Sequence, residues 1–299
     1  MNHMRTSRRD VIRRCCFAMV MALLGTLVAA GWSSATAAAK GRSHHSSPAR
    51  LVTSKARKVG IFTSSITIYP PSEFVEKNGK TYTGWEVQLT NAVFKLLHLK
   101  VKYITVSVTA NIPGVQDGRW QLSDGTWGVT KPRLKMVNFV TDLRAGTQLY
   151  VAKGTKLKIR SKQDVCGLTV AVQKATVEQT RAYAYQKTCS SLGKSPMHIQ
   201  LYPSEPDVVL AVTGGRAEVA WTTGIPAGYV VKQHPGQFKL IGGNFTFSTI
   251  GIVVSKKYPG LARAMAAAIN RLIKDGKYAK ILRAWGVGKS GIHHSVVRT

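Results

Sequence analysis

The sequence predicts an α/β fold, because strand-like apolar segments alternate with helical segments along most of its length. Its 299 residues, 44% of them hydrophobic, can form one large domain or two modest lobes with ample core. Residues 58–62 have the pattern of a first strand, residues 84–97 place an apolar face on one side of a helix, and residues 101–108 alternate as a strand. The chain is therefore expected to form a globular α/β protein.

The most informative stretch is residues 112–142, which reads IPGVQDGRWQLSDGTWGVTKPRLKMVNFVTD. It predicts a helical start, a turn, a short strand, a helical turn that Thr130 opens, and an apolar strand near residues 137–140. Arg133 follows a glycine-rich segment whose backbone can approach a ligand closely. A guanidinium at this position suits bidentate capture of a carboxylate. The alternative is an ordinary surface arginine in a chain that has many basic residues.

Several spaced residues in this stretch carry a resemblance. The order Ile-Pro-Gly-Val-x-x-Gly-Arg-Trp, Thr-x-x-Arg and Val-x-Phe-Val resembles family 3 of the bacterial extracellular solute-binding proteins, the receptors of polar amino-acid ABC importers. Tyr69-Pro70-Pro71, residues 84–89 and residues 275–286 extend it over roughly residues 58–292. The resemblance implies a two-lobed periplasmic-binding-protein fold of type II, with a hinge between the lobes. Lobe 1 is expected over residues 57–145 and 246–290, and lobe 2 over residues 146–245.

The same resemblance implies a ligand site between the lobes. Arg133 and the backbone near Gly128 are expected to hold a carboxylate from lobe 1. Thr176 is expected to do so from lobe 2, where Thr-x-x-Gln spacing predicts a helix start with free N–H groups. A plain solvent-facing helix cap is the alternative for Thr176. The other residues expected to line the ligand site are Thr126, Trp127, Tyr69, Phe62, Asn111, Lys174 and Thr223.

Two of these positions depart from the family pattern. Phe62 and Thr223 stand where the family has the aspartates that bind a ligand ammonium group. A buried ammonium without a carboxylate is costly, although hydroxyl groups and an aromatic face could still hold a cation. The departures therefore favour an organic anion or an unusual amino acid over an ordinary α-amino acid.

The charge balance is strongly basic, with 43 Lys and Arg residues against 13 Asp and Glu residues and a formal net charge of +30. Such a charge favours anionic partners in general. The basic residues are spread through the chain, and the sequence has neither zinc-finger spacing nor an aromatic RNA-binding motif, so no nucleic-acid partner is predicted. A scarcity of carboxylates would also protect the fold in an acidic extracytoplasmic compartment.

The amino-terminal segment is typical of a cleavable export signal. Ser7-Arg8-Arg9 resembles a twin-arginine motif, residues 17–30 are apolar, and Ala37-Ala38-Ala39 precedes a cleavage point at Lys40. An uncleaved anchor is the alternative, and export through the Tat or the Sec pathway stays open. Residues 40–56 are expected to be a disordered linker and residues 291–299 a tail. The protein is expected to be periplasmic or secreted.

Two cysteines follow the predicted signal, Cys166 and Cys189. An even pair in an exported protein predicts one disulfide.

The sequence thus predicts an extracytoplasmic solute receptor that captures an amino acid or related small carboxylate and delivers it to an ABC transporter permease. We expect a monomer with no metal and no cofactor. A hydrolase is not predicted, because neither Gly-x-Ser-x-Gly nor His-Glu-x-x-His is present. The alternatives are a cyclohexadienyl-acid dehydratase-like enzyme on the same fold and a cell-surface protein that binds polymers through its charge.

Overall fold

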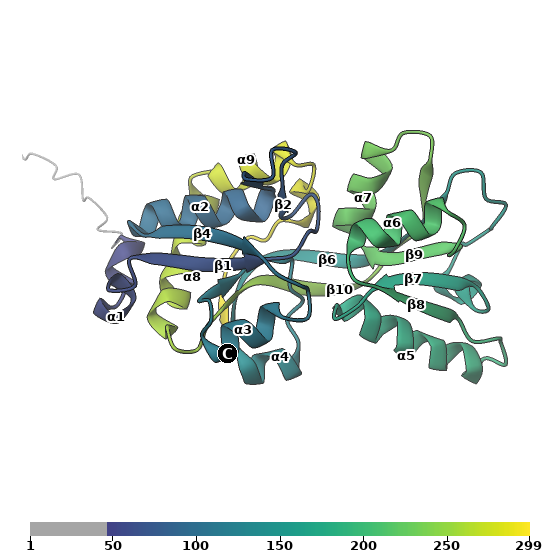
Figure 1. Ribbon diagram of the computed structural model, residues 1–299, viewed down its shortest axis with the longest axis horizontal. Coiled ribbons are helices and arrows are strands. Elements are labelled where there is room, and N and C mark those ends of the chain that lie inside the picture. Colours follow the sequence, from purple (N-terminus) through teal and green to yellow (C-terminus); the bar gives the residue numbers. More distant parts are fainter. Residues whose placement is uncertain (1–46) are drawn as a thin grey trace, which may run out of the picture. The chain divides into compact units, whose positions relative to one another are not determined.

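The computed structural model describes residues 47–299, and the predicted export signal lies outside the described residues. The described part of the chain contains one nine-stranded sheet, with strand order β4-β1-β5-β10-β6-β9-β7-β8 and with β11 also paired to β6, and a small two-stranded sheet, β2-β3 (Figure 1). The strands are β1 Ile61–Ile66, β2 Phe74–Val75, β3 Tyr82–Thr83, β4 Lys100–Thr105, β5 Leu122–Ser123, β6 Asn138–Ala152, β7 Thr169–Gln173, β8 His198–Tyr202, β9 Val219–Thr223, β10 Phe238–Val254 and β11 Val297–Arg298. The helices are α1 Ser54–Arg57, α2 Trp85–Leu97, α3 Asn111–Asp117, α4 Lys131–Met136, α5 Val177–Ser191, α6 Glu205–Thr213, α7 Gly224–Gln233, α8 Pro259–Lys274 and α9 Lys277–Ala284, with short 3-10 turns η1 Pro48–Leu51, η2 Lys162–Val165 and η3 Gly288–Ser290.

Two long antiparallel strands, β6 and β10, connect two groups of elements (Figure 1). The parallel strands β4, β1 and β5 join the carboxyl end of β10, whereas β9, β7 and β8 join the carboxyl half of β6. We call the first group lobe 1 and the second lobe 2. The pairing of β6 with β10 shifts register between Ile241 and Ser248, where the strands pass from one lobe to the other. The predicted two-lobed α/β architecture is confirmed.

Each lobe has its own apolar core on each face of the sheet. In lobe 1, Trp85 and Phe94 of α2 pack with α8 on one face, and Trp120 and Phe139 lie in the core on the other face. In lobe 2, Trp221 belongs to one core, and the second core contains Tyr150, Phe238 and side chains of α6 and α7. Burial of each large side chain contributes about 1.5–3 kcal/mol. Most of each core lies within one lobe, and only Ile225 and Ala175 of lobe 2 join or pack against the lobe 1 clusters in the described residues, so rotation of the lobes about β6 and β10 would disturb few core contacts.

Local hydrogen bonds begin the two helices that matter most for the site. The Thr130 hydroxyl accepts from the Arg133 N–H at the start of α4, and the Thr176 hydroxyl accepts from the Gln179 N–H at the start of α5. Both starts were predicted from the sequence. Gly84, before α2, has a φ of 125°, and a Cβ there would lie 2.1 Å from the Ser72 carbonyl oxygen, so this position requires glycine.

Both ends of the described chain differ from expectation. Residues 40–56 were expected to be a disordered linker, yet in the described part, residues 47–56, η1 forms and α1 begins, and Ala49, Val52 and Ala56 are buried. The turn η1 packs on α8, and Val52 and Ala56 share a core cluster with side chains of α8. This contact is long-range and has no local sequence signal. The expected tail, residues 291–299, instead adds β11 to the edge of β6, and the Ser295 N–H donates to Asn270 Oδ1.

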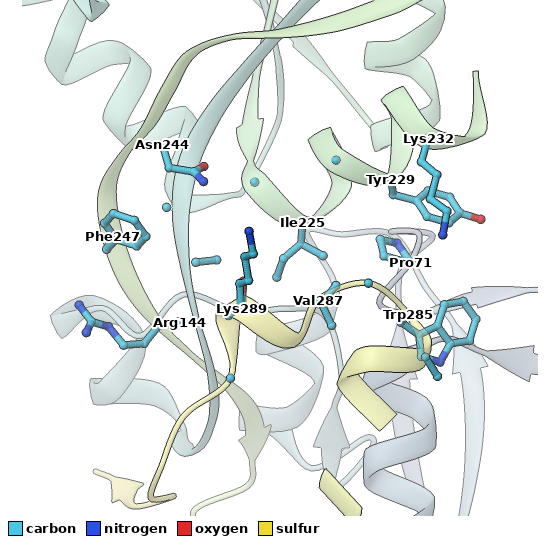
Figure 2. Close-up of a pocket in the computed structure, with 18 of the residues that line it drawn as sticks. Pro71, Arg144, Ile225, Tyr229, Lys232, Asn244, Phe247, Trp285, Val287 and Lys289 are labelled. Atoms are coloured by element: carbon cyan, nitrogen blue, oxygen red, sulfur yellow. The ribbon is translucent and has the colours of Figure 1, made fainter. Parts of the chain in front are cut away.

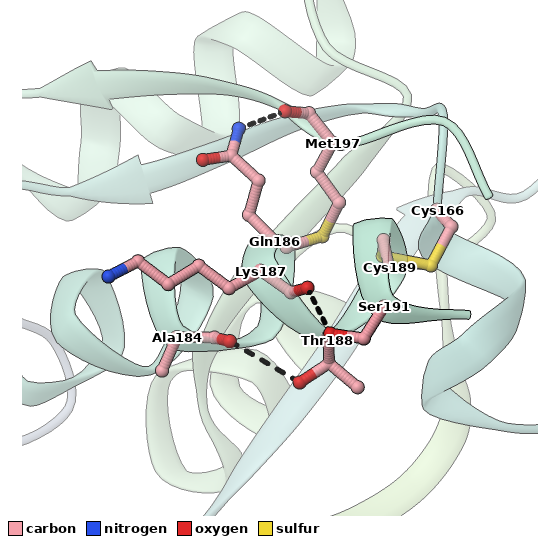
Figure 3. Close-up of a disulfide and its surroundings, with 8 residues drawn as sticks. All are labelled: Cys166, Ala184, Gln186, Lys187, Thr188, Cys189, Ser191 and Met197. Atoms are coloured by element: carbon pink, nitrogen blue, oxygen red, sulfur yellow. Dashed lines mark hydrogen bonds between the residues drawn. A yellow bond between two sulfur atoms is a disulfide. The ribbon is translucent and has the colours of Figure 1, made fainter. Parts of the chain in front are cut away.

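The predicted disulfide is confirmed. Cys166 and Cys189 are bonded, which ties the turn before β7 to the last turn of α5 (Figure 3). The Cys189 side chain is buried in a core of lobe 2.

None of the helices in the described part of the chain combines the length and apolar character that crossing a bilayer requires.

Candidate functional site

A small cleft lies where the two lobes meet. Its walls come from the loop after β5 and from α4 in lobe 1, and from the β7–α5 connection and the end of β9 in lobe 2. The cavity that remains is about 20 Å³, which is room for about one water molecule. A larger solute can therefore enter only if the lobes separate. Seven predicted site residues line the cleft: Tyr69, Thr126, Trp127, Gly128, Arg133, Thr176 and Thr223.

Arg133 bridges the two lobes. Its Nη1 donates to the Gly128 carbonyl at 2.9 Å and its Nη2 to the Ala175 carbonyl of lobe 2 at 2.8 Å. The guanidinium lies 5.2 Å from the ring centroid of Trp127, a cation–π contact. Burial lowers the pKa of Arg133 to about 10, so the group stays cationic at neutral and acidic pH. In the described part of the chain, no carboxylate pairs with this charge. The unused N–H groups of Arg133 can therefore donate hydrogen bonds to an anionic partner.

The lobe 2 wall carries a carboxylate that the sequence did not single out, Glu178. One of its oxygens accepts from Arg181 Nη1 at 2.7 Å, and the other accepts from the Thr147 hydroxyl at 2.7 Å and from Trp221 Nε1 at 3.0 Å. Burial raises the pKa of Glu178, and the charge of Arg181 opposes that rise. Glu178 therefore already has its cation and its donors.

A chain of hydroxyl groups crosses the cleft beside Glu178. The Tyr69 hydroxyl of lobe 1 lies 3.1 Å from the Thr223 hydroxyl and 3.4 Å from the Thr222 hydroxyl, both on β9. Thr222 donates in turn to Glu205 at 3.1 Å. Burial raises the pKa of Glu205 to about 8, so this carboxyl is neutral at acidic pH. The pKa of Tyr69 is also raised by burial, which keeps the phenol protonated.

The loop that carries Gly128 is held in place by hydrogen bonds to Glu86 of α2. Oε2 of Glu86 accepts the backbone N–H groups of Gly125 at 2.9 Å and of Thr126 at 2.8 Å. A Cβ on Gly128 would lie 2.6 Å from Val177 Cγ1, so only glycine allows the two lobes to approach this closely.

Three predicted site residues lie outside the cleft lining. Phe62 is fully buried in the lobe 1 core, with edge-to-face contacts to Phe94 and Tyr258. Asn111 is buried, and its Oδ1 accepts from Ser123 Oγ. Lys174 is exposed. Six residues that sequence reasoning missed line the cleft: Thr67, Val108, Gly125, Gln173, Val177 and Glu178. Gly125, Val177 and Gln173 adjoin predicted residues, whereas Glu178 showed only as part of a helix start.

A second and larger cavity of about 870 Å³ shares no lining residue with the cleft (Figure 2). Side chains of Tyr229, Trp285 and Phe247 line it together with Arg144, Lys232 and Lys289. Figure 2 shows Lys289 directed toward Ile225, whereas the Arg144 guanidinium points away. Basic residues are spread throughout this chain, so their presence here does not mark a ligand site.

Fold and cleft together define a two-lobed receptor of the type II periplasmic-binding-protein class, with a hinge formed by β6 and β10. The chain belongs to the family of bacterial extracellular solute-binding proteins, family 3, whose sequence pattern matches residues 62–288.

Several similar proteins are amino-acid-binding proteins. The arginine-binding protein ArgT of Corynebacterium glutamicum is 25% identical over 230 residues, which cover 77% of this chain and 75% of that protein. The ABC transporter glutamine-binding protein GlnH of Bacillus subtilis is 25% identical over 208 residues, covering 68% of this chain and 72% of that protein. An ancestral arginine-binding protein bound to arginine has a TM-score of 0.68 and 26% identity, and the match covers 76% of this chain and 98% of that one.

Proposed function

We propose that this protein captures a small carboxylate-bearing solute in the cleft between its lobes and delivers it to an ABC transporter permease. The observation that carries the proposal is the Arg133 guanidinium, which faces the cleft without a carboxylate partner in the described chain. A partly buried cation whose acceptors are two neutral carbonyls is under-compensated. A solute carboxylate would replace these acceptors with a charge-assisted, bidentate partner.

Contacts that cross the cleft support a mechanism of lobe closure. Arg133 reaches the Ala175 carbonyl, and Tyr69 reaches Thr223, so the same groups that would hold a solute already join the lobes. A solute that contacts both lobes binds the closed form better and shifts the population toward it. The permease would then recognise the closed form. Delivery to a permease is supported by relatives named as ABC transporter binding proteins.

The charges around the cleft favour an anionic or neutral solute over a cationic one. Relatives are named as arginine-binding and glutamine-binding proteins. An arginine side chain would need a free carboxylate, because leaving a buried charge unpaired costs several kcal/mol. Here Glu178 is already paired with Arg181, and Glu205 is neutral at acidic pH. We infer that the solute is a carboxylic acid or an amino acid without a cationic side chain.

Binding without turnover fits the same arrangement. A dehydratase needs a free base close to the reacting carbon, whereas the carboxylate that lines the cleft, Glu178, is saturated with donors. The named relatives are binding proteins. A structure similar to this one, at 25% identity and a TM-score of 0.67, is an ancestral amino-acid-binding protein described as a precursor of cyclohexadienyl dehydratase. We place the receptor outside the cytoplasm, exported by the predicted signal.

Calorimetric titration of the protein with L-glutamate, L-glutamine, succinate and L-arginine tests the function. We expect binding of one or more of the first three and weak or no binding of arginine. Arg133→Ala should weaken that binding by about tenfold to more than a hundredfold, the usual value of a charge-assisted hydrogen-bonded pair. Arg119→Ala is the matched control, because Arg119 is an exposed arginine of the same lobe. Equal affinity of the Arg133→Ala variant and the unmodified protein would refute the site.

A further inference from the structure

Four of the 13 acidic residues are buried together in lobe 1, although the chain is strongly basic. Glu73 precedes β2, Glu86 lies in α2, Asp124 follows β5 and Asp142 lies in β6. Each has an exposed fraction of 0%. We call these four residues the carboxyl cluster. Within residues 47–299, none of the four forms an ion pair, and no group of three or more metal-ligating side chains is arranged to hold a metal ion.

Two members of the carboxyl cluster have conventional donors. Asp124 accepts from the Ser64 hydroxyl at 3.0 Å and from the Thr90 hydroxyl at 2.7 Å. Glu86 accepts through Oε2 from the N–H groups of Gly125 and Thr126, which belong to the wall of the ligand cleft. Glu86 therefore determines where this wall lies.

The other oxygens of the carboxyl cluster have no conventional hydrogen-bond donor among the described residues. In this part of the chain, these oxygens accept no hydrogen bond from a backbone N–H, a hydroxyl or an amide group. They are Oε1 of Glu86 and both carboxyl oxygens of Glu73 and of Asp142. The carboxyls of Glu73 and Asp142 lie within hydrogen-bonding reach of Glu86. Ionised carboxylates cannot donate to one another, so a buried set of this kind is satisfied only when protons remain on it. A proton on Glu73 and another on Asp142 make both groups donors to Glu86.

The other titratable groups near the cluster do not compensate its charge. Tyr278 of α9 donates its hydroxyl to the Asp142 backbone carbonyl at 2.7 Å. Tyr103 of β4 lies close enough to Asp124 and Glu86 for their charges to act on it. Burial raises the pKa of both phenols, so they remain neutral. Burial also raises the pKa of Glu73, Asp124 and Asp142 well above the ordinary range, and the Glu86 carboxyl raises all three further.

We propose that Glu86 is a positioning residue for the ligand cleft, and that protons on Glu73 and Asp142 hold it in place, so that solute capture weakens as the pH rises. The proposal rests on the proposed function, because it concerns the regulation of the same cleft. When the two protons are lost, three carboxylates face one another, and no cation among residues 47–299 forms an ion pair with them. Glu86 then moves toward water, and the loop of residues 125–128 loses its acceptor.

Amide hydrogen exchange measured by NMR tests this without any solute. The amides of Gly125 and Thr126 report directly on their hydrogen bonds to Glu86. We expect their protection factors to fall at least about tenfold between about pH 5 and about pH 8. The double variant Glu73→Gln and Asp142→Asn carries permanent donors, so its protection factors should stay level. The control pair is Glu76→Gln and Asp117→Asn, which alters two exposed acids and should behave like the unmodified protein.

Three outcomes decide the proposal. Level protection in the unmodified protein, or an equal fall in the double variant, overturns it. A fall that the double variant abolishes supports it. If the double variant does not fold, the single variants are measured, and each should reduce the fall. The solute titrations are then repeated at both pH values with the probes named above, and affinity should be at least about tenfold weaker at the higher pH. If none of those probes binds, the proposed function fails while the amide result stands on its own.

Discussion

Glu205 offers the sharpest test of the electrostatics inferred for this protein. It is the first residue of α6, its exposed fraction is 2%, and one carboxyl oxygen accepts from Thr222 while the other meets no donor. Burial raises its pKa from the ordinary 4.5 to about 8. Because the folded form binds the proton more tightly than the unfolded form, the stabilisation is complete below about pH 4.5 and is lost as the pH rises toward 8.

The size of this effect follows from the pKa difference. At about 1.4 kcal/mol per pKa unit, the shift corresponds to about 5 kcal/mol. Glu205→Gln keeps an oxygen for Thr222 and removes the ionisation. We therefore expect the free energy of unfolding of this variant, relative to the unmodified protein, to increase by about 4 kcal/mol between pH 4.5 and pH 8. The remainder of the shift lies outside this range, because the unfolded carboxyl is half protonated at pH 4.5 and the folded one at pH 8.

Urea unfolding at four or five pH values across this range measures the difference directly. Other carboxyls titrate in both proteins, so only the difference between the two curves reports Glu205. Glu76→Gln is the control, because Glu76 is exposed and its substitution should leave the curve unchanged. Parallel curves for Glu205→Gln and the unmodified protein would refute the assignment of a neutral, buried carboxyl.

Three further predictions concern the disulfide and the cleft. Replacing Cys166 and Cys189 with serine should lower the free energy of unfolding by about 3 kcal/mol on the loop-entropy account, measured in oxidising buffer. Reduction of the unmodified protein should lower it by the same amount, and a clearly larger loss in the variant than on reduction would contradict the loop-entropy account. Gly128→Ala should weaken solute binding at least about tenfold by its clash with Val177, and Val177→Ala in the same chain should restore part of it; full binding by the single variant would contradict the closed geometry. Thr223→Asp places a carboxylate beside Tyr69 in the cleft and should increase the affinity for L-arginine about tenfold or more in calorimetry, and unchanged arginine affinity would count against the charge argument.

Features that depend on local sequence or on residue type were predicted correctly from the sequence. Thr130 and Thr176 signal helix starts through their own side chains, and the two helices that follow carry the site. Cys166 and Cys189 form the bond that their number and export context predicted. In each case the interaction spans few residues or depends on residue type alone.

Predictions that needed packing information were less successful. Phe62 was assigned to the cleft from its position in the family pattern, but its ring lies in the lobe 1 core. Lys174 sits beside the predicted anion site in sequence and yet is exposed. The direction of a side chain at the edge of a strand or loop depends on which neighbours cover it, and those neighbours are distant in sequence.

The sequence by itself determined the α/β class, the two-lobed family, the helix caps and the disulfide. Only the tertiary structure decided the charges that a solute would meet. It paired Glu178 with Arg181, and it brought Glu73, Glu86, Asp124 and Asp142 from four segments into one buried cluster. A carboxyl group has the same formula everywhere in the chain, and its charge depends on the water and donors that remain around it after distant segments have packed.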